Sequence, residues 1–129
     1  MGTILIFEDL EIWQLSRQQA LDIYQIYNQE SFSKDWGLKN QINAASGSVM
    51  DNIAEGFERS GNKEFIHFLL IAKGSNGEVR SQLCRTIDRN YLVREKYDDL
   101  KIKNETLSKK ITSFIKYLKE SDRKGFRYE

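Results

Sequence analysis

The polar residues with the most suggestive spacing lie in the stretch DNIAEGFERSGNKEF, residues 51–65. Asn52, Glu55 and Arg59 are spaced at i, i+3 and i+7, which places them on one face of a helix. Glu55 and Arg59 also form an i, i+4 pair in the favourable order. A catalytic carboxylate, a ligand contact and a structural hydrogen bond would all produce this pattern. The surrounding elements must therefore decide between them.

Ser75 and Glu78 on the next helical segment complete this polar set if the two helices run antiparallel. Glu55 and Glu78 would then need arginine or amide partners to be buried at low cost. The interpretation that we favour is a polar network that fixes helix pairing or subunit docking. The alternative is a site for a ligand or a nucleic acid.

Residues for other kinds of chemistry are sparse in this sequence. The only histidine, His67, follows Glu64 by three residues, which matches one half of a di-iron carboxylate motif, but the second half is missing. No second histidine or cysteine pair accompanies it to bind zinc, and no glycine-rich phosphate loop follows a strand. We predict no catalytic residues, no metal, no cofactor and no enzymatic activity.

The hydrophobic periodicity predicts the elements that must position these residues. It indicates amphipathic helices at about 9–30, 35–59, 62–90 and 94–121, followed by a tail at 122–129. We expect Asp9 to be an N-cap, Ser33 and Asp35 to be capping residues in the connection after the first helix, and Ser60–Asn62 to end the second helix and cap the third. The predicted fold class is all-α, an antiparallel up-down four-helix bundle in a single domain spanning residues 1–129.

Two features of these helices bear on packing. The fourth has a heptad seam in which Asn104 is the one polar residue, and such an Asn typically sets register or partner number. Glycine and serine also occur within the second and third helices, at 44–48 and 72–78. Because glycine costs about 1 kcal/mol relative to alanine in a helix, we expect a close approach of these two backbones in compensation. Flexibility for function is the alternative.

The composition limits the classes of protein to which this chain can belong. The chain has 129 residues, 40% hydrophobic and 30% charged, as in a soluble globular domain. No apolar run approaches the length of about 18 residues that spans a membrane. Cys84, the one cysteine, is expected to be a small core residue and cannot form an intrachain disulfide. These features favour a cytoplasmic protein.

The net charge of +1 conceals an asymmetry. Residues 1–30 hold one basic and five acidic side chains, whereas residues 94–129 hold eleven basic and seven acidic ones. The simpler interpretation is a solvated helix face and a frayed tail. The alternative is a footprint for nucleic acid or an acidic partner, with phosphate contacts at Lys101, Lys109, Lys110, Lys116, Lys119, Arg123, Lys124 and Arg127.

Three long segments resemble one known family. FEDLEIWQLSRQQALDIY, GLKNQINAASGSVMDNIAEGFERSGNKEF and FLLIAKGSNGEVRSQL are similar to the four-helix bundle proteins of the 23S rRNA intervening-sequence type, also called the S23 ribosomal protein family. The resemblance covers about residues 7–120. Its most specific part is NIAEG followed by R-S-x-x-K-E-F, and then A-x-G-S-x-x-E.

The resemblance implies a four-helix bundle that assembles as a homopentamer and has no established catalytic residues. A related branch binds a reverse transcriptase and nucleic acid through a basic surface, from which this nearly neutral chain departs. The family-pattern positions, read as fold and assembly determinants, are Asn52, Glu55, Gly56, Ser75 and Glu78.

Two functions follow as expectations. The first is a non-enzymatic oligomeric scaffold or adaptor with a protein partner, associated with rRNA intervening sequences. Aromatic residues outside the seams, namely Phe32, Trp36 and Tyr91, favour it. The second is an RNA- or DNA-binding module that uses the basic fourth helix and the tail, where Phe126 or Tyr128 would stack on bases.

Overall fold

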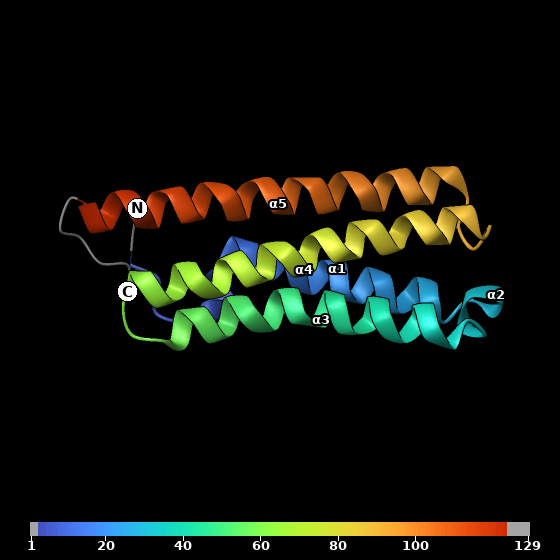
Figure 1. The fold of residues 1–129 in the computed structure, drawn as a ribbon, viewed down its shortest axis with the longest axis horizontal. Helices are drawn as coiled ribbons and strands as arrows, with labels where there is room; N and C mark the ends of the chain where they lie inside the picture. The colour runs from blue at the N-terminus through green and yellow to red at the C-terminus, as the bar shows by residue number, and fades with distance from the viewer. Residues whose placement is uncertain (1–2, 124–129) are drawn as a thin grey trace.

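The structure, a computed structural model, describes residues 3–123 and is all-helical over that range. A 3₁₀ turn η1 (Phe7–Asp9) is followed by α1 (Glu11–Tyr27), α2 (Glu30–Ser33), α3 (Trp36–Glu58), α4 (Asn62–Asp88) and α5 (Arg94–Arg123). Figure 1 shows the four long helices side by side along the longest axis, each running opposite to the one before it in the chain. The short α2 lies at one end, between α1 and α3.

The long helices enclose one hydrophobic core. α3 packs against α1 and α4, and α5 packs against α4 and α1. The predicted seam of α5 faces this core, since Tyr97, Leu100, Asn104, Leu107, Ile111 and Leu118 are all buried and Phe114 is packed against them. None of the helices in the described range combines the length and apolar composition that crossing a bilayer requires.

The start of α1 differs from the prediction. The N-cap of α1 is Leu10, without a side-chain cap, and not Asp9. Asp9 instead ends the η1 turn, which is closed by a hydrogen bond of 2.9 Å from the Leu10 N–H to the Phe7 carbonyl. The Phe7 ring packs edge-on against Trp13, with centroids 5.2 Å apart. This apolar contact places the turn where a capping carboxylate was expected.

The connections also differ from the prediction in two places. The first helix ends at Tyr27 rather than near residue 30, and the connection after it contains the separate helix α2. α4 begins after Gly61, whose φ of 88° favours glycine and which makes no side-chain cap. Asn62 is no cap either, because it is buried and its Nδ2 lies 3.4 Å from the Leu118 carbonyl oxygen.

Asp35 caps α3 as predicted, and it also joins two distant connections. Its carboxylate accepts hydrogen bonds from the Leu38 N–H at 3.2 Å, from Arg89 at 2.6 Å and from the Tyr91 hydroxyl at 2.7 Å. The hydrogen bond from Tyr91, and then that from Arg89, hold the pKa of Asp35 below its usual value. The start of α3 is thereby tied to the turn between α4 and α5.

That turn has a regular geometry. Asn90 adopts φ of 59°, and the N–H groups of Asn90 and Tyr91 donate to the carbonyls of Ile87 and Thr86, as in a Schellman motif. The Tyr91 ring stacks on Phe32 with centroids 5.1 Å apart, and Phe32 is fully buried. Phe32 therefore belongs to the interior of this corner and Tyr91 is half-buried against it, which corrects their expected role as surface contacts.

The mid-helix glycines do not have the predicted common cause. A Cβ atom at Gly47, Gly74 or Gly77 would meet nothing within 4 Å, so the expected close approach is absent there. It occurs instead at Gly56, where a Cβ would lie 2.8 Å from the Phe68 Cβ. Gly56 thus lets the end of α3 pack directly on the start of α4.

We predict opposite effects for two Gly→Ala substitutions within helices. Gly56→Ala overpacks the contact with Phe65 and Phe68 and should lower the free energy of unfolding by about 1–3 kcal/mol. Gly74→Ala has open space and should raise it by up to about 1 kcal/mol. Urea denaturation of both variants measures the difference. Equal shifts in the two midpoints would show that the close approach at Gly56 is not real.

Candidate functional site

Part of the predicted polar set forms a bridge between α3 and α4. The Asn52 Nδ2 donates to the Ser48 carbonyl at 2.8 Å and to the Ser48 hydroxyl at 2.9 Å. The Ser48 hydroxyl lies 3.0 Å from the Ser75 hydroxyl, across the helix pair. Asn52 and Ser75 are thus brought together through Ser48, a residue of the small-residue stretch at 44–48 that was not predicted to belong to the polar set.

The charged members of the set lie apart from this bridge. Arg59 donates to Glu55 at 2.9 Å, and its guanidinium lies 3.6 Å from Glu64 and 4.9 Å from the centre of the Phe68 ring. Glu55, Arg59 and Glu78 are all exposed, and Glu78 does not contact the other two. Exposed ion pairs of this kind contribute at most about 1 kcal/mol. The expected burial of the two carboxylates does not occur.

A buried layer of amides joins three helices at the centre of the molecule. The Gln19 Nε2 donates to the Asn76 Oδ1 at 2.9 Å, and the Asn104 Nδ2 donates to the Gln19 Oε1 at 2.8 Å. The Asn76 Nδ2 donates to the Asn104 carbonyl, and the Asn104 Nδ2 donates to the Asn76 carbonyl, both at 3.0 Å. Arg80 closes the layer by donating to the Asn104 Oδ1 at 3.0 Å.

Only Asn104 of this amide layer was predicted from the sequence. Asn76 could have been found by the same criterion, because it stands between the buried Ala72 and Val79 at steps of four and three. Gln19 likewise lies one turn before the buried Ile23. A polar side chain in phase with an apolar stripe was the available signal. The partner of each amide could not be deduced, because it lies on another helix.

Titratable residues elsewhere do not gather into a reactive centre. Among residues 3–123, no three His, Cys, Asp or Glu side chains come close enough to hold a metal ion. His67 is exposed, with its ring edge-on to Phe68. Cys84 is exposed rather than in the core, and its Sγ lies 3.4 Å from the Tyr97 hydroxyl.

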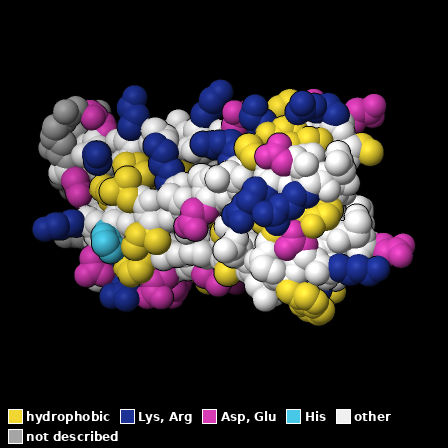
Figure 2. Space-filling model, turned by 45° about the vertical axis from the view of Figure 1, so that its right-hand side comes forward, with side chains coloured by type: hydrophobic (Ala, Val, Ile, Leu, Met, Phe, Trp, Pro, Cys, Tyr) yellow, Lys and Arg dark blue, Asp and Glu magenta, His cyan; other side chains and the backbone are white. Residues whose placement is uncertain are grey.

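The basic residues of α5 fall into two groups. Lys109, Lys116 and Lys119 are exposed and Lys101 is half-buried, whereas Lys110 lies 3.2 Å from Glu11 of α1. Arg123 ends α5, while Lys124 and Arg127 lie outside the described residues, as do Phe126 and Tyr128. On the face drawn in Figure 2, basic side chains are interspersed with acidic and apolar ones.

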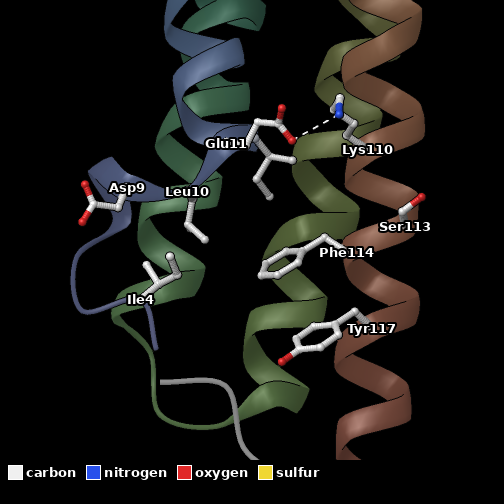
Figure 3. Close-up of a pocket in the computed structure, with 9 residues that line it drawn as sticks. Ile4, Asp9, Leu10, Glu11, Lys110, Ser113, Phe114 and Tyr117 are labelled. Carbon is white, nitrogen blue, oxygen red and sulfur yellow. Dashed lines mark hydrogen bonds and ion pairs between the residues drawn. The ribbon is translucent and has the colours of Figure 1, made fainter. Parts of the chain in front are cut away.

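The Lys110–Glu11 pair closes one end of an apolar groove of about 520 Å³ between α5 and the N-terminal segment. Figure 3 shows Phe114 and Tyr117 extending from α5 toward Ile4 and Leu10 on the other side. Of its polar side chains, Glu11 and Lys110 pair with each other, and those of Asp9 and Ser113 point away from the groove in Figure 3. Its shape and chemistry suit an apolar contact.

The chain matches known proteins at the level of family and fold. The sequence profile of the 23S rRNA-intervening sequence protein family matches residues 8–113. A crystal structure of a protein with unknown function from the S23 ribosomal protein family of Bacteroides thetaiotaomicron VPI-5482 superimposes with a TM-score of 0.71. The two sequences are 23% identical, and the match covers 81% of this chain and 98% of the other. No curated protein matches the sequence significantly.

We predict that Asn104→Ala is far more damaging than Asn52→Ala. The first substitution removes the donor to the Gln19 Oε1 and the acceptor of the Arg80 guanidinium, and an unsatisfied buried polar group costs about 1–3 kcal/mol. Asn52 is only half-buried and bonds mainly within its own helix, so its loss should cost less than about 1 kcal/mol. Thermal and urea unfolding of both variants measure the two losses. Comparable losses would contradict the central role of the amide layer.

Proposed function

Because the chain belongs to the 23S rRNA-intervening sequence protein family, we propose that it acts as a non-enzymatic oligomeric scaffold or adaptor. Its long helices form an antiparallel up-down four-helix bundle in this proposal. The oligomer is a homo-oligomer in the cytoplasm, with the five subunits that the family resemblance implies. The polar bridge between α3 and α4 serves helix pairing and not catalysis.

The observation that carries this proposal is the outer face of α1. Leu21 is 48% exposed and Tyr24 is 55% exposed, and both belong to the same side of the helix as Arg17. The surface around Leu21 includes a shallow depression of about 610 Å³ that also involves Trp13. The remaining exposed residues of this helix are mostly glutamines. Leu21 and Tyr24 thus lie on a helix surface that is poor in charged residues, and depletion of charged residues is typical of the centre of a protein interface.

Trp36 is a further exposed aromatic residue. It is 66% exposed at the start of α3, with the Lys39 ammonium 4.8 Å from the centre of its ring. Tryptophan is among the residues that contribute most to binding energy at interfaces. Of the three aromatics first assigned to a protein partner, Trp36 alone keeps that assignment.

We predict that Leu21→Glu lowers the molar mass of the native particle, because it places a charge in the proposed subunit contact. Size-exclusion chromatography with light scattering measures the mass, and circular dichroism checks that the helices remain. Ile102→Glu is the matched control, since Ile102 is 62% exposed on α5. It should keep the wild-type mass. A monomeric wild-type protein, or a Leu21→Glu variant of unchanged mass, would contradict the proposal.

A nucleic-acid-binding module is the second candidate. It is favoured by Lys109, Lys116 and Lys119, which recur at steps of seven and three and so share one side of α5. Among the described residues these three lysines form no ion pair. Three such cations in line along a helix suit contacts with successive phosphates of RNA.

We predict that the double variant Lys109→Gln/Lys116→Gln binds RNA with a weaker salt dependence if this second candidate is correct. Each lost phosphate contact should reduce the slope of log K against log salt by about 0.7–0.9. Fluorescence anisotropy with a labelled RNA hairpin at several salt concentrations measures the slope. Lys103→Gln is the control, because Lys103 lies on another side of α5 and pairs with Asp99 at 3.2 Å. An unchanged slope in the double variant would exclude α5 as the RNA surface.

A further inference from the structure

A second groove, the α3–α4 groove, lies on a different face from the surfaces discussed so far. It has a volume of about 460 Å³ and runs between the two helices that Ser48 and Ser75 bridge. Ala44 and Ala45 contribute small side chains on the α3 side, and Glu78, Gln82 and Arg85 line the α4 side. Small side chains along its base allow the main chain of another molecule to approach closely.

Gln82 has an unmet hydrogen-bonding requirement in this groove. The residue is 6% exposed, and its Oε1 is the one buried side-chain oxygen or nitrogen in the described residues that has no hydrogen-bond partner. A buried acceptor without a donor costs free energy, so such atoms are rare in native proteins. Because the last torsion of a glutamine is broad, a small rotation of the amide brings the oxygen to a donor that enters the groove.

Charges of opposite sign stand on either side of Gln82. Glu78 is exposed and Arg85 is half-buried, and neither side chain forms an ion pair within the described residues. The two are seven residues apart, which corresponds to about 10.5 Å along the helix. Two turns of helix thus present a carboxylate, an amide acceptor and a guanidinium in a row.

The same side of α4 also carries an apolar residue, one heptad before Glu78. Ile71 precedes Glu78 by seven residues and is 40% exposed. An occupant of the groove that extends in this direction finds an apolar contact about 10.5 Å beyond the carboxylate.

We propose that the α3–α4 groove binds an extended peptide segment of a partner protein, with a basic side chain opposite Glu78 and an acidic side chain opposite Arg85. The proposal rests on the adaptor function above and names where the partner docks. A peptide segment in the extended polyproline II conformation advances about 3.1 Å per residue and has three residues per turn, so side chains three positions apart lie on one side and about 9 Å apart, close to the spacing of the two charges. An apolar side chain three residues before the basic one meets Ile71.

An extended segment fits better than a helix for a physical reason. The main-chain N–H groups of a helix are already bonded within the helix, whereas those of an extended chain are free to donate to Gln82. The main chain then supplies hydrogen bonds, and the side chains of every third residue supply selectivity.

The test is selection from a random dodecapeptide display library on the purified wild-type protein. The enriched peptides should share a basic and an acidic residue three positions apart. Isothermal titration calorimetry with one synthesised peptide then measures Kd. Glu78→Lys and Arg85→Glu should each weaken binding at least tenfold, and Gln82→Leu should weaken it severalfold while leaving the melting temperature equal or higher. Glu95→Lys, an exposed charge change on α5, is the control and should bind like wild type.

Several outcomes would overturn the proposal. These are no enrichment of peptides, enriched peptides without the charge pattern, or peptides that bind the Glu78→Lys and Arg85→Glu variants as tightly as wild type. A loss of molar mass in those variants without peptide binding would identify a second copy of the chain as the occupant. The readouts separate this proposal from the adaptor proposal, because the mass of the Leu21→Glu variant reports on assembly and the Kd reports on the groove.

Discussion

The arrangement of the helices depends on the buried amide layer of Gln19, Asn76 and Asn104. Apolar side chains attract one another without direction, so a wholly apolar interior would tolerate sliding of one helix along another. The amides remove this freedom, because each donor has its acceptor on a different helix. A shift of one helical turn would leave several buried polar groups unpaired. The layer also links α1 to α4. Each of these two helices packs mainly against α3 and α5.

The surface features follow from this fixed interior. With the register set by the amide layer, Gly56 meets Phe65 and Phe68 at a single close approach, and Asp35 reaches Arg89 and Tyr91 at the opposite end of α3. The helix ends are therefore held by contacts that the register brings together. What remains outside is a set of helix faces with different chemistry, to which the proposed scaffold function assigns the binding contacts.

The sequence predicted the elements well and their contacts poorly. Apolar periodicity located the four long helices and the buried seam of α5, because burial of one stripe acts on every turn of a helix. Asp35 was identified as a cap because its role is local to α3. Asp9 was misassigned because a tertiary contact between Phe7 and Trp13 decides the backbone there. Gly74 and Gly77 were misread because composition alone does not show which side of a helix is empty.

The polar residues of the candidate site illustrate the same limit. Asn52, Glu55 and Arg59 share a helix face, and this much was visible in their spacing. Their environments differ because Asn52 donates to Ser48 and joins the bridge, whereas Glu55 pairs with the exposed Arg59 at the C-cap of α3. Glu78 belongs instead with Gln82 and Arg85, which share its helix face one and two turns on. We propose that the family-pattern residues have two separate tasks, one in holding α3 against α4 and one in lining the groove beside them. The proposed second task rests on Gln82, because its Oε1 has no hydrogen-bond partner within the described residues.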